Sequence, residues 1–288
     1  MAALLYERGL LDLEIPVVAV VPEFAVDSSG SNDPRRGQVT LRMLLAHSSG
    51  LPGHRPLFEG AKSREELVLL AVKTPLANDP GMAVEYSDVG FIVLGEALTR
   101  LADEPLDTFC KREIFGPLGL SGTGFSPLPE QRSQIPPTAD EPNFRRRAIQ
   151  GEVHDDNAAA MGGVAPHAGL FSPAQDLARF AHAMIGGGAP ILRSETLARF
   201  TRRELSPPGT TRTLGWDTPS EGSLAGQHFL PGSYGHLGFT GTSLWIDPER
   251  QISITLLTNR TWPGGTNIAI RQVRPQFHDA IMERLIHS

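Results

Sequence analysis

The 288-residue sequence predicts an α+β fold: an antiparallel sheet flanked by helices and joined to a mostly helical lobe. Two observations lead to this prediction. Helical patterns fill the middle of the chain, whereas β-rich runs concentrate in its last third. Strands and helices that are segregated along a chain in this way are typical of an antiparallel sheet with its helices set apart.

The clearest strand signal is a hairpin near the C-terminus. Residues 242–247 and 252–258 are rich in β-branched and aromatic side chains, and a polar turn containing Pro248 separates them. Apolar side chains alternate along the second run, so they gather on one face of a strand. We therefore expect a hairpin inside a sheet that has at least one face covered by apolar packing.

Helix signals come mainly from capping patterns. Ser63 and Glu66 form a capping box for a helix that runs to Val72, and Ser172–Gln175 forms a second one ahead of a helix over 176–185. A long apolar helix is expected over 89–101 and a closing helix over 268–286. The sequence predicts one domain over 1–288, with a helical lobe at about 25–200 and a sheet lobe from 1–24 and 201–288.

Composition excludes several classes of function. The net charge of −6 gives no reason to expect nucleic acid or an anionic membrane as a partner, and Arg145–Arg147 is the only basic run, interpreted as a solvated loop. Cys110 is the only cysteine, which rules out an internal disulfide. No apolar run is long enough to span a bilayer and no signal peptide is visible, so as written the chain is expected in the cytoplasm.

Tyr86-Ser87-Asp88 is the first group that could carry chemistry. A tyrosine just before a helix start lies where backbone N–H dipoles favour an anion, which could lower its pKa and make it a general base or proton shuttle. The alternative is a packed aromatic beside a helix cap. His47, at the end of a short helix, is interpreted as a residue that bonds backbone carbonyls.

Two further regions are rich in polar and glycine residues. Closely spaced glycines from Gly235 to Gly241 surround His236 and let the backbone approach a ligand, or else mark a β-bulge. His154, Asp155 and His167 lie in a loop-rich region and could be metal ligands, but their spacing matches no metal signature. A hydrogen-bonded loop that shapes a cleft is favoured, and no metal or cofactor is expected.

Five segments in the right order resemble the serine β-lactamase and penicillin-binding-protein superfamily, in its class C, esterase and D-aminopeptidase-like branch. Tyr86-Ser87-Asp88 is similar to the Tyr-x-Asn element, and His236-Leu237-Gly238 to the Lys-Thr-Gly element. The other three segments are Arg8–Val17, Val39–Pro52 and Gly163–Phe180.

The resemblance implies a serine hydrolase that acts through an acyl-enzyme. Catalytic roles then fall to Tyr86 as proton shuttle, Asp88 and His236. Substrate or oxyanion contacts are expected from Ser87, Gly238, Phe239, Thr240, Gly241, His154 and His167. Asp88 stands in place of the family's Asn. Two further departures, Leu237 for Thr or Ser and His236 for Lys, favour esters, amides or peptides over β-lactams, because a hydroxyl and a permanent cation are lost.

The family's Ser-x-x-Lys nucleophile motif has no match in this sequence. Only Lys62, Lys73 and Lys111 are present, and none follows a serine at that spacing. The resemblance places the motif upstream of Met1, together with two strands. We therefore expect a chain that begins late, an open edge on its last strand, and little or no activity. A leader directing the protein to the periplasm or outside the cell is then also conceivable.

Three hypotheses about function stay open at this point. The first is a β-lactamase-like hydrolase of a small-molecule or peptide substrate. The second is a non-catalytic relative that binds a cell-wall fragment or peptide. The third is a metal hydrolase built on His154, Asp155 and His167. The sequence does not define the oligomeric state.

Overall fold

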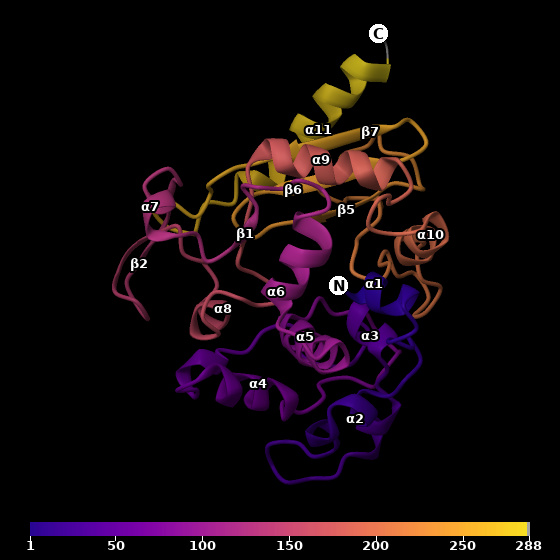
Figure 1. Cartoon of the computed structure of the whole chain (residues 1–288), viewed down its shortest axis with the longest axis vertical. Helices are drawn as coiled ribbons and strands as arrows, with labels where there is room; N and C mark the ends of the chain where they lie inside the picture. The colour runs from indigo at the N-terminus through magenta and orange to yellow at the C-terminus, as the bar shows by residue number, and fades with distance from the viewer. Residues whose placement is uncertain (287–288) are drawn as a thin grey trace.

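The computed structural model describes residues 1–286 as helices around small antiparallel sheets (Figure 1). No described helix is both long and apolar enough to cross a membrane. The α-helices are α1 (Ala2–Glu7), α2 (Val17–Val20), α3 (Leu41–Leu45), α4 (Arg64–Val72), α5 (Asp88–Ala102), α6 (Leu106–Cys110), α7 (Pro129–Arg132), α8 (Asp156–Ala160), α9 (Ala174–Ile185), α10 (Ser194–Thr201) and α11 (Ile270–Ile286).

The strands form three separate antiparallel sheets. β5, β6 and β7 pair in that order, β1 pairs with β4, and β2 with β3. The predicted fold class, an antiparallel sheet flanked by helices plus a helical lobe, is confirmed. The strands are β1 (Gly124–Phe125), β2 (Pro137–Glu141), β3 (Arg147–Gln150), β4 (Leu170–Phe171), β5 (Tyr234–Leu237), β6 (Ser243–Asp247) and β7 (Ile252–Leu256).

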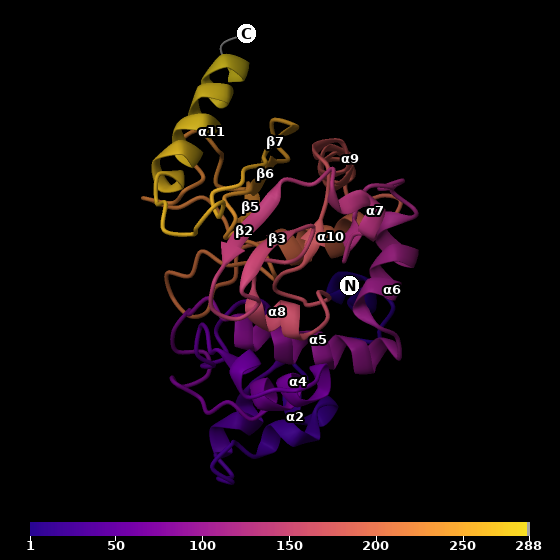
Figure 2. The ribbon, with the colours of Figure 1, turned by 90° about the vertical axis from the view of Figure 1, so that its left-hand side faces the viewer.

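The predicted hairpin is present as β6 and β7, in register from Ser243 opposite Leu256 to Asp247 opposite Ile252. Apolar residues lie on both sides of this three-stranded sheet. Ile246 packs with residues of α9 on one face, and Trp245 with Met282 of α11 on the other. The sheet is thus enclosed between two helices, and Figure 2 shows α9 and α11 on opposite sides of it.

β7 forms the edge of this sheet, because within the described residues it pairs only with β6. An unpaired edge offers free backbone N–H and C=O groups. The side chains next to it are partly covered, and Leu257, just beyond the strand, is 43% exposed. The open edge expected from the sequence is therefore found in the described chain.

The boundary between the two lobes differs from the expected one. Residues of α1 and α2 belong to the large core of helices around α5, although 1–24 was assigned to the sheet lobe. Conversely α9, expected in the helical lobe, packs against β6 and β7. The reason is packing: both assignments followed position in the chain, whereas each apolar face is buried wherever a complementary face lies.

One of the two predicted capping boxes is present only in part. Ser63 caps α4 by accepting from the Glu66 N–H at 3.2 Å, whereas Glu66 itself reaches the Lys62 N–H. The box at Ser172 is wrong, because α9 begins at Ala174 and has no side-chain cap. The Ser172 hydroxyl instead lies 2.7 Å from that of Thr123, which joins the sheet β1–β4 to this helix start.

A fully buried arginine, Arg36, connects two segments of the helical lobe. The Arg36 guanidinium donates to the carbonyls of Phe24, Val72 and Thr74, the last at 2.8 Å, and lies 3.9 Å from the Phe24 ring centre. Two of these carbonyls lie at or just beyond the end of α4, where backbone C=O groups lack a partner within the helix. Arg36 therefore joins the segment after α2 to the end of α4.

We expect Arg36→Met to lower the free energy of unfolding by about 3 kcal/mol, because buried carbonyls lose their donors while the apolar volume is kept. Urea unfolding followed by circular dichroism measures this. Arg35→Met is the matched control: Arg35 forms exposed pairs with Asp33 and Asp79, and its loss should change stability little. Equal effects of the two variants would contradict the assignment.

Candidate active site

Ser87 fixes the start of α5 and so the place of its neighbours. Its hydroxyl accepts from the Gly90 N–H at 2.8 Å and donates to the Pro52 carbonyl at 2.7 Å. The side chain is only 1% exposed. The structure therefore uses Ser87 as a helix cap, the alternative to the predicted substrate contact.

Tyr86 stands at the point where the helical lobe meets the sheet. Its ring centre lies 4.4 Å from that of His47 and 5.9 Å from that of His236, which β5 carries. The Arg212 guanidinium lies 5.5 Å from the same ring. The structure thus brings together Tyr86 and His236, which are far apart in sequence, and Tyr86 keeps 42% of its surface exposed.

The buried ring of His47 packs against Tyr86. It adopts a left-handed backbone with φ of 56°, its Nδ1 accepts from the Ser87 N–H at 3.0 Å, and its ring stacks on Phe91 at 4.6 Å. The expectation that this ring bonds backbone carbonyls is therefore wrong, because Nδ1 acts as an acceptor. Burial, helped by the charge of Arg212, lowers the pKa of His47 to about 3.

The titration of Tyr86 runs opposite to the prediction. Burial, followed by the charge of Asp88, raises the pKa of the Tyr86 phenol to about 12. Burial also raises the pKa of Asp88 above its ordinary value. At neutral pH Tyr86 is a neutral phenol, which can donate a proton or a hydrogen bond.

His236 and the turn that follows it form the opposite wall. His236 Nδ1 lies 3.0 Å from the Leu237 carbonyl, so Nδ1 carries the proton and Nε2 is left as an acceptor. Burial, then the charge of Arg212, lowers the pKa of His236. A neutral imidazole thus stands where the related motif has a lysine.

The turn after β5 needs glycine at two positions. A Cβ at Gly238 would lie 2.1 Å from the Thr242 hydroxyl, and one at Gly241, with φ of 102°, would lie 2.0 Å from the Thr258 hydroxyl. The Gly238 and Gly241 N–H groups bond within the turn. Among the described residues, the N–H groups of Phe239 and Thr240 have no acceptor, so they are free to donate to a ligand.

Sequence reasoning missed Arg212. It lies in the loop between α10 and β5, where nothing in the local pattern separates it from other loop arginines. Its Nη1 lies 3.6 Å from Asp217, and its Nε is buried without a partner among the described residues. Since it lowers the pKa of both His47 and His236, Arg212 is the permanent positive charge beside Tyr86.

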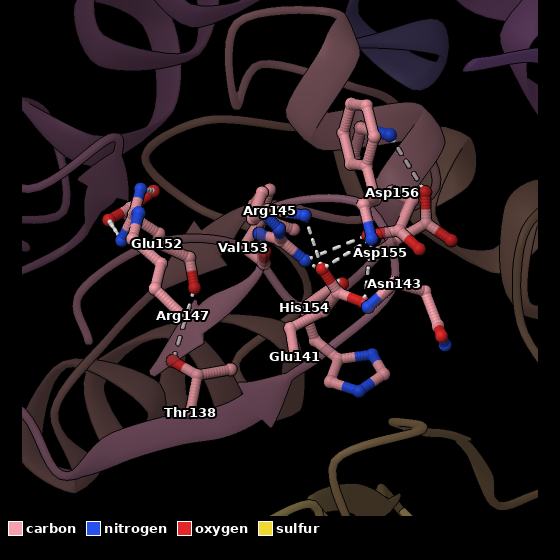
Figure 3. Close-up of polar contacts among 12 residues, drawn as sticks. Thr138, Glu141, Asn143, Arg145, Arg147, Glu152, Val153, His154, Asp155 and Asp156 are labelled. Carbon is pink, nitrogen blue, oxygen red and sulfur yellow. Dashed lines mark hydrogen bonds and ion pairs between the residues drawn. The ribbon is translucent and has the colours of Figure 1, made fainter. Parts of the chain in front are cut away.

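The two histidines of the loop-rich region do not converge. The His154 ring lies 5.2 Å from that of Phe239, whereas His167 is buried and its Nε2 lies 2.9 Å from Asp155 Oδ1. In Figure 3 the His154 imidazole points away from the hydrogen-bonded network. The structure does not group His154 with Asp155 and His167, and the group it forms instead is His54, Asp88 and Asp155.

Arg145 organises this loop, contrary to the expectation of a solvated arginine run. Its guanidinium donates to the carbonyls of Val153 and His154 and to Asp156, at 2.5, 2.7 and 2.9 Å (Figure 3). The side chain is only 9% exposed. Arg145 therefore holds the segment that carries His154 and Asp155.

Comparison with known proteins identifies the family that this chain resembles. The model of the Beta-lactamase family matches residues 1–275. A protein of Salmonella agona named "Putative D-alanyl-D-alanine carboxypeptidase" is 34% identical over 291 residues, a match that covers 89% of this chain and 65% of the relative. A Salmonella typhi protein of the same name matches equally. The chain thus spans about two thirds of the length of these curated relatives.

Solved structures show the same fold. The hydrolase EstCE1, described as having promiscuous acyltransferase activity, has a TM-score of 0.69 at 22% identity, over 95% of this chain and 81% of its own. Unliganded simvastatin synthase of Aspergillus terreus has a TM-score of 0.70 at 20% identity, and the match covers 100% of this chain and 81% of that protein. A penicillin-binding-protein homolog of Caulobacter crescentus has a TM-score of 0.67 at 18% identity, and the match covers 96% of this chain and 78% of that protein.

We expect stability to fall in acid because of His47. Its pKa is about 3 in the folded chain against 6.5 as a free side chain, so between these pH values the unfolded chain binds a proton that the folded chain does not. The free energy of unfolding therefore falls as the pH is lowered through 6.5 towards 3. From pH 7 to 5 the wild type should lose about 2 kcal/mol more than His47→Asn, which tolerates the left-handed backbone. Urea titrations at both pH values test this, and parallel losses would contradict it.

Proposed function

The chain belongs to the β-lactamase family, and we propose that its cleft binds an ester, amide or peptide substrate of a β-lactamase-type serine hydrolase. One observation carries the proposal: the rings of Tyr86 and His236 meet at the junction of helices and sheet, with their centres 5.9 Å apart and their planes tilted by 47°. A reacting carbonyl bound beside this pair would have a phenol near it and the backbone N–H groups of the turn after β5 available to its oxygen.

Each group then has a role that its protonation state allows. Tyr86, a neutral phenol, passes a proton to the leaving group, and Asp88 at the start of α5 organises that side of the cleft. Neutral His236 offers Nε2 as an acceptor. The N–H groups of Phe239 and Thr240 stabilise the oxyanion.

The chain as given holds no Ser-x-x-Lys, because Glu59, Leu70 and Thr108 stand three residues before its three lysines. We therefore propose that residues 1–288 provide the residues that line the substrate site but not the nucleophile. We expect this stretch by itself to be inactive or nearly so. The alternative function, binding of a peptide or cell-wall fragment without turnover, is favoured by the same observation.

Intact-mass measurement tests whether this chain contains a nucleophile that can be acylated. After incubation with excess p-nitrophenyl acetate and, separately, a penicillin, we expect the mass of the 288-residue chain to stay unchanged, since no activated serine is present. A stable single adduct would contradict this assignment, and peptide mapping would identify the acylated residue. Hydrolysis above background that Tyr86→Phe abolishes would contradict it as well.

The name of the Salmonella relatives suggests a substrate class for this cleft. We propose a peptide that ends in D-alanyl-D-alanine, with its free carboxylate at Arg212. Arg212 is the permanent cation beside Tyr86, and among the described residues its guanidinium forms an ion pair only with Asp217, at 3.6 Å, which leaves charge and N–H groups for an anion. It would supply the charge that neutral His236 lacks.

Binding of N-acetyl-D-alanyl-D-alanine, measured by calorimetry, tests this role. We expect Arg212→Gln to weaken binding by about 10- to 100-fold, because a charge-assisted hydrogen bond to the carboxylate is lost. Arg179→Gln, which alters an exposed arginine on α9, is the control and should bind like the wild type. Equal affinity of wild type and Arg212→Gln, or for the peptide and its methyl ester, would refute the assignment.

A further inference from the structure

Three side chains that could bind a metal ion converge beside the candidate active site. One ligand atom each from His54, Asp88 and Asp155 lies within 4.8 Å of the others. His54 belongs to the loop after α3, Asp88 begins α5, and Asp155 is the N-cap of α8. The sequence reasoning had considered only Asp155 of these three as a ligand.

Hydrogen bonds with main-chain groups, two of them made by the Asn157 side chain, hold the three segments together. The Asp88 N–H donates to the Gly53 carbonyl at 2.8 Å, which fixes the loop of His54 against α5. Asn157, fully buried in α8, accepts from the Phe58 N–H at 3.0 Å and donates to the Arg55 carbonyl at 2.8 Å. The same loop is therefore tied to both elements that carry the carboxylates, and their convergence is built into the fold.

One oxygen of Asp155 is fixed and the other is left over. Oδ1 accepts from the Ala158 N–H at 2.7 Å and lies 2.9 Å from Nε2 of His167, whose side chain is only 2% exposed. Among the described residues, Oδ2 has no hydrogen-bond donor. A carboxylate oriented through one oxygen, with the other available, is the usual arrangement of a metal ligand.

No arginine or lysine among the described residues balances the charges of this group. Within those residues, Asp88 and Asp155 form ion-pair contacts only with His54 and His167. Two partly buried carboxylates side by side repel each other, and a bound cation would remove this cost.

We propose that His54, Asp88 and Asp155 bind a divalent transition-metal ion, for which Zn²⁺ is the best match. One imidazole nitrogen with two carboxylate oxygens suits zinc better than calcium or magnesium, which prefer oxygen alone. Ligand atoms at about 2.1 Å from one ion lie at most about 4.2 Å apart. His54, whose side chain is 56% exposed, can rotate by the small amount that is required.

Asp88 supplies the second carboxylate of the proposed site. The Tyr-x-Asn element that Tyr86-Ser87-Asp88 resembles has asparagine at this position, whose neutral amide would leave Asp155 as the only negatively charged ligand. The proposal extends beyond acyl transfer, because it concerns a cation site next to Tyr86 and requires no nucleophile.

Isothermal calorimetry with ZnCl₂ on the whole 288-residue chain, after EDTA treatment and dialysis, tests the site. We expect one ion per chain, with a rise in melting temperature on binding. Asp88→Asn and His54→Ala should each weaken zinc binding at least about 10-fold, and CaCl₂ should bind more weakly. His54 is exposed and Asp88→Asn keeps the side-chain shape, so both variants should fold, as circular dichroism would verify.

His228→Ala is the matched control, because it removes another exposed histidine that pairs with a carboxylate, that of Glu283 on α11. It should leave zinc affinity unchanged. Absence of stoichiometric zinc binding, or equal affinity in Asp88→Asn and the wild type, would overturn the proposal. No acyl substrate enters this titration, so its outcome is independent of the proposed hydrolase function.

Discussion

The candidate site depends on one buried hydrogen bond, from the Ser87 N–H to His47 Nδ1. It ties the turn after α3 to the start of α5 and presses the His47 ring against Tyr86. The ring can accept this bond only while it is neutral. Burial lowers the pKa of His47 and so keeps it neutral, which means that the packing that positions Tyr86 also preserves the bond that holds it.

The electrostatics of the candidate site follow from the charged residues on its two sides. Arg212 provides a fixed positive charge on the side of His236, and it depresses the pKa of that histidine. Asp88 and Asp155 provide negative charge on the helical side, and their charges add to the rise of the Tyr86 pKa. Tyr86 lies between these charges, so its surroundings are polar on both sides, whereas the large core of helices is apolar.

Helix caps, helix lengths and the hairpin were predicted well where the residues that determine them are close in sequence. The hairpin, the Ser63 cap of α4 and the length of α5 each rest on neighbouring residues. Errors arose where a distant partner competed. Ser172 bonds Thr123 and does not cap α9, and Arg145 turns inward to carbonyls of the 153–156 segment. Hydroxyl and guanidinium groups take whichever partner the fold brings near, and a short window of sequence does not contain it.

The sequence by itself determined the fold class, the family resemblance and the two segments that carry Tyr86 and His236. Only the tertiary structure decided their electrostatic setting: the raised pKa of Tyr86, Arg212 beside it, and the convergence of His54 with Asp88 and Asp155. The physical reason is that periodicity and caps act between neighbouring residues. Burial and Coulomb interactions instead depend on distances in space, between residues that the chain separates widely.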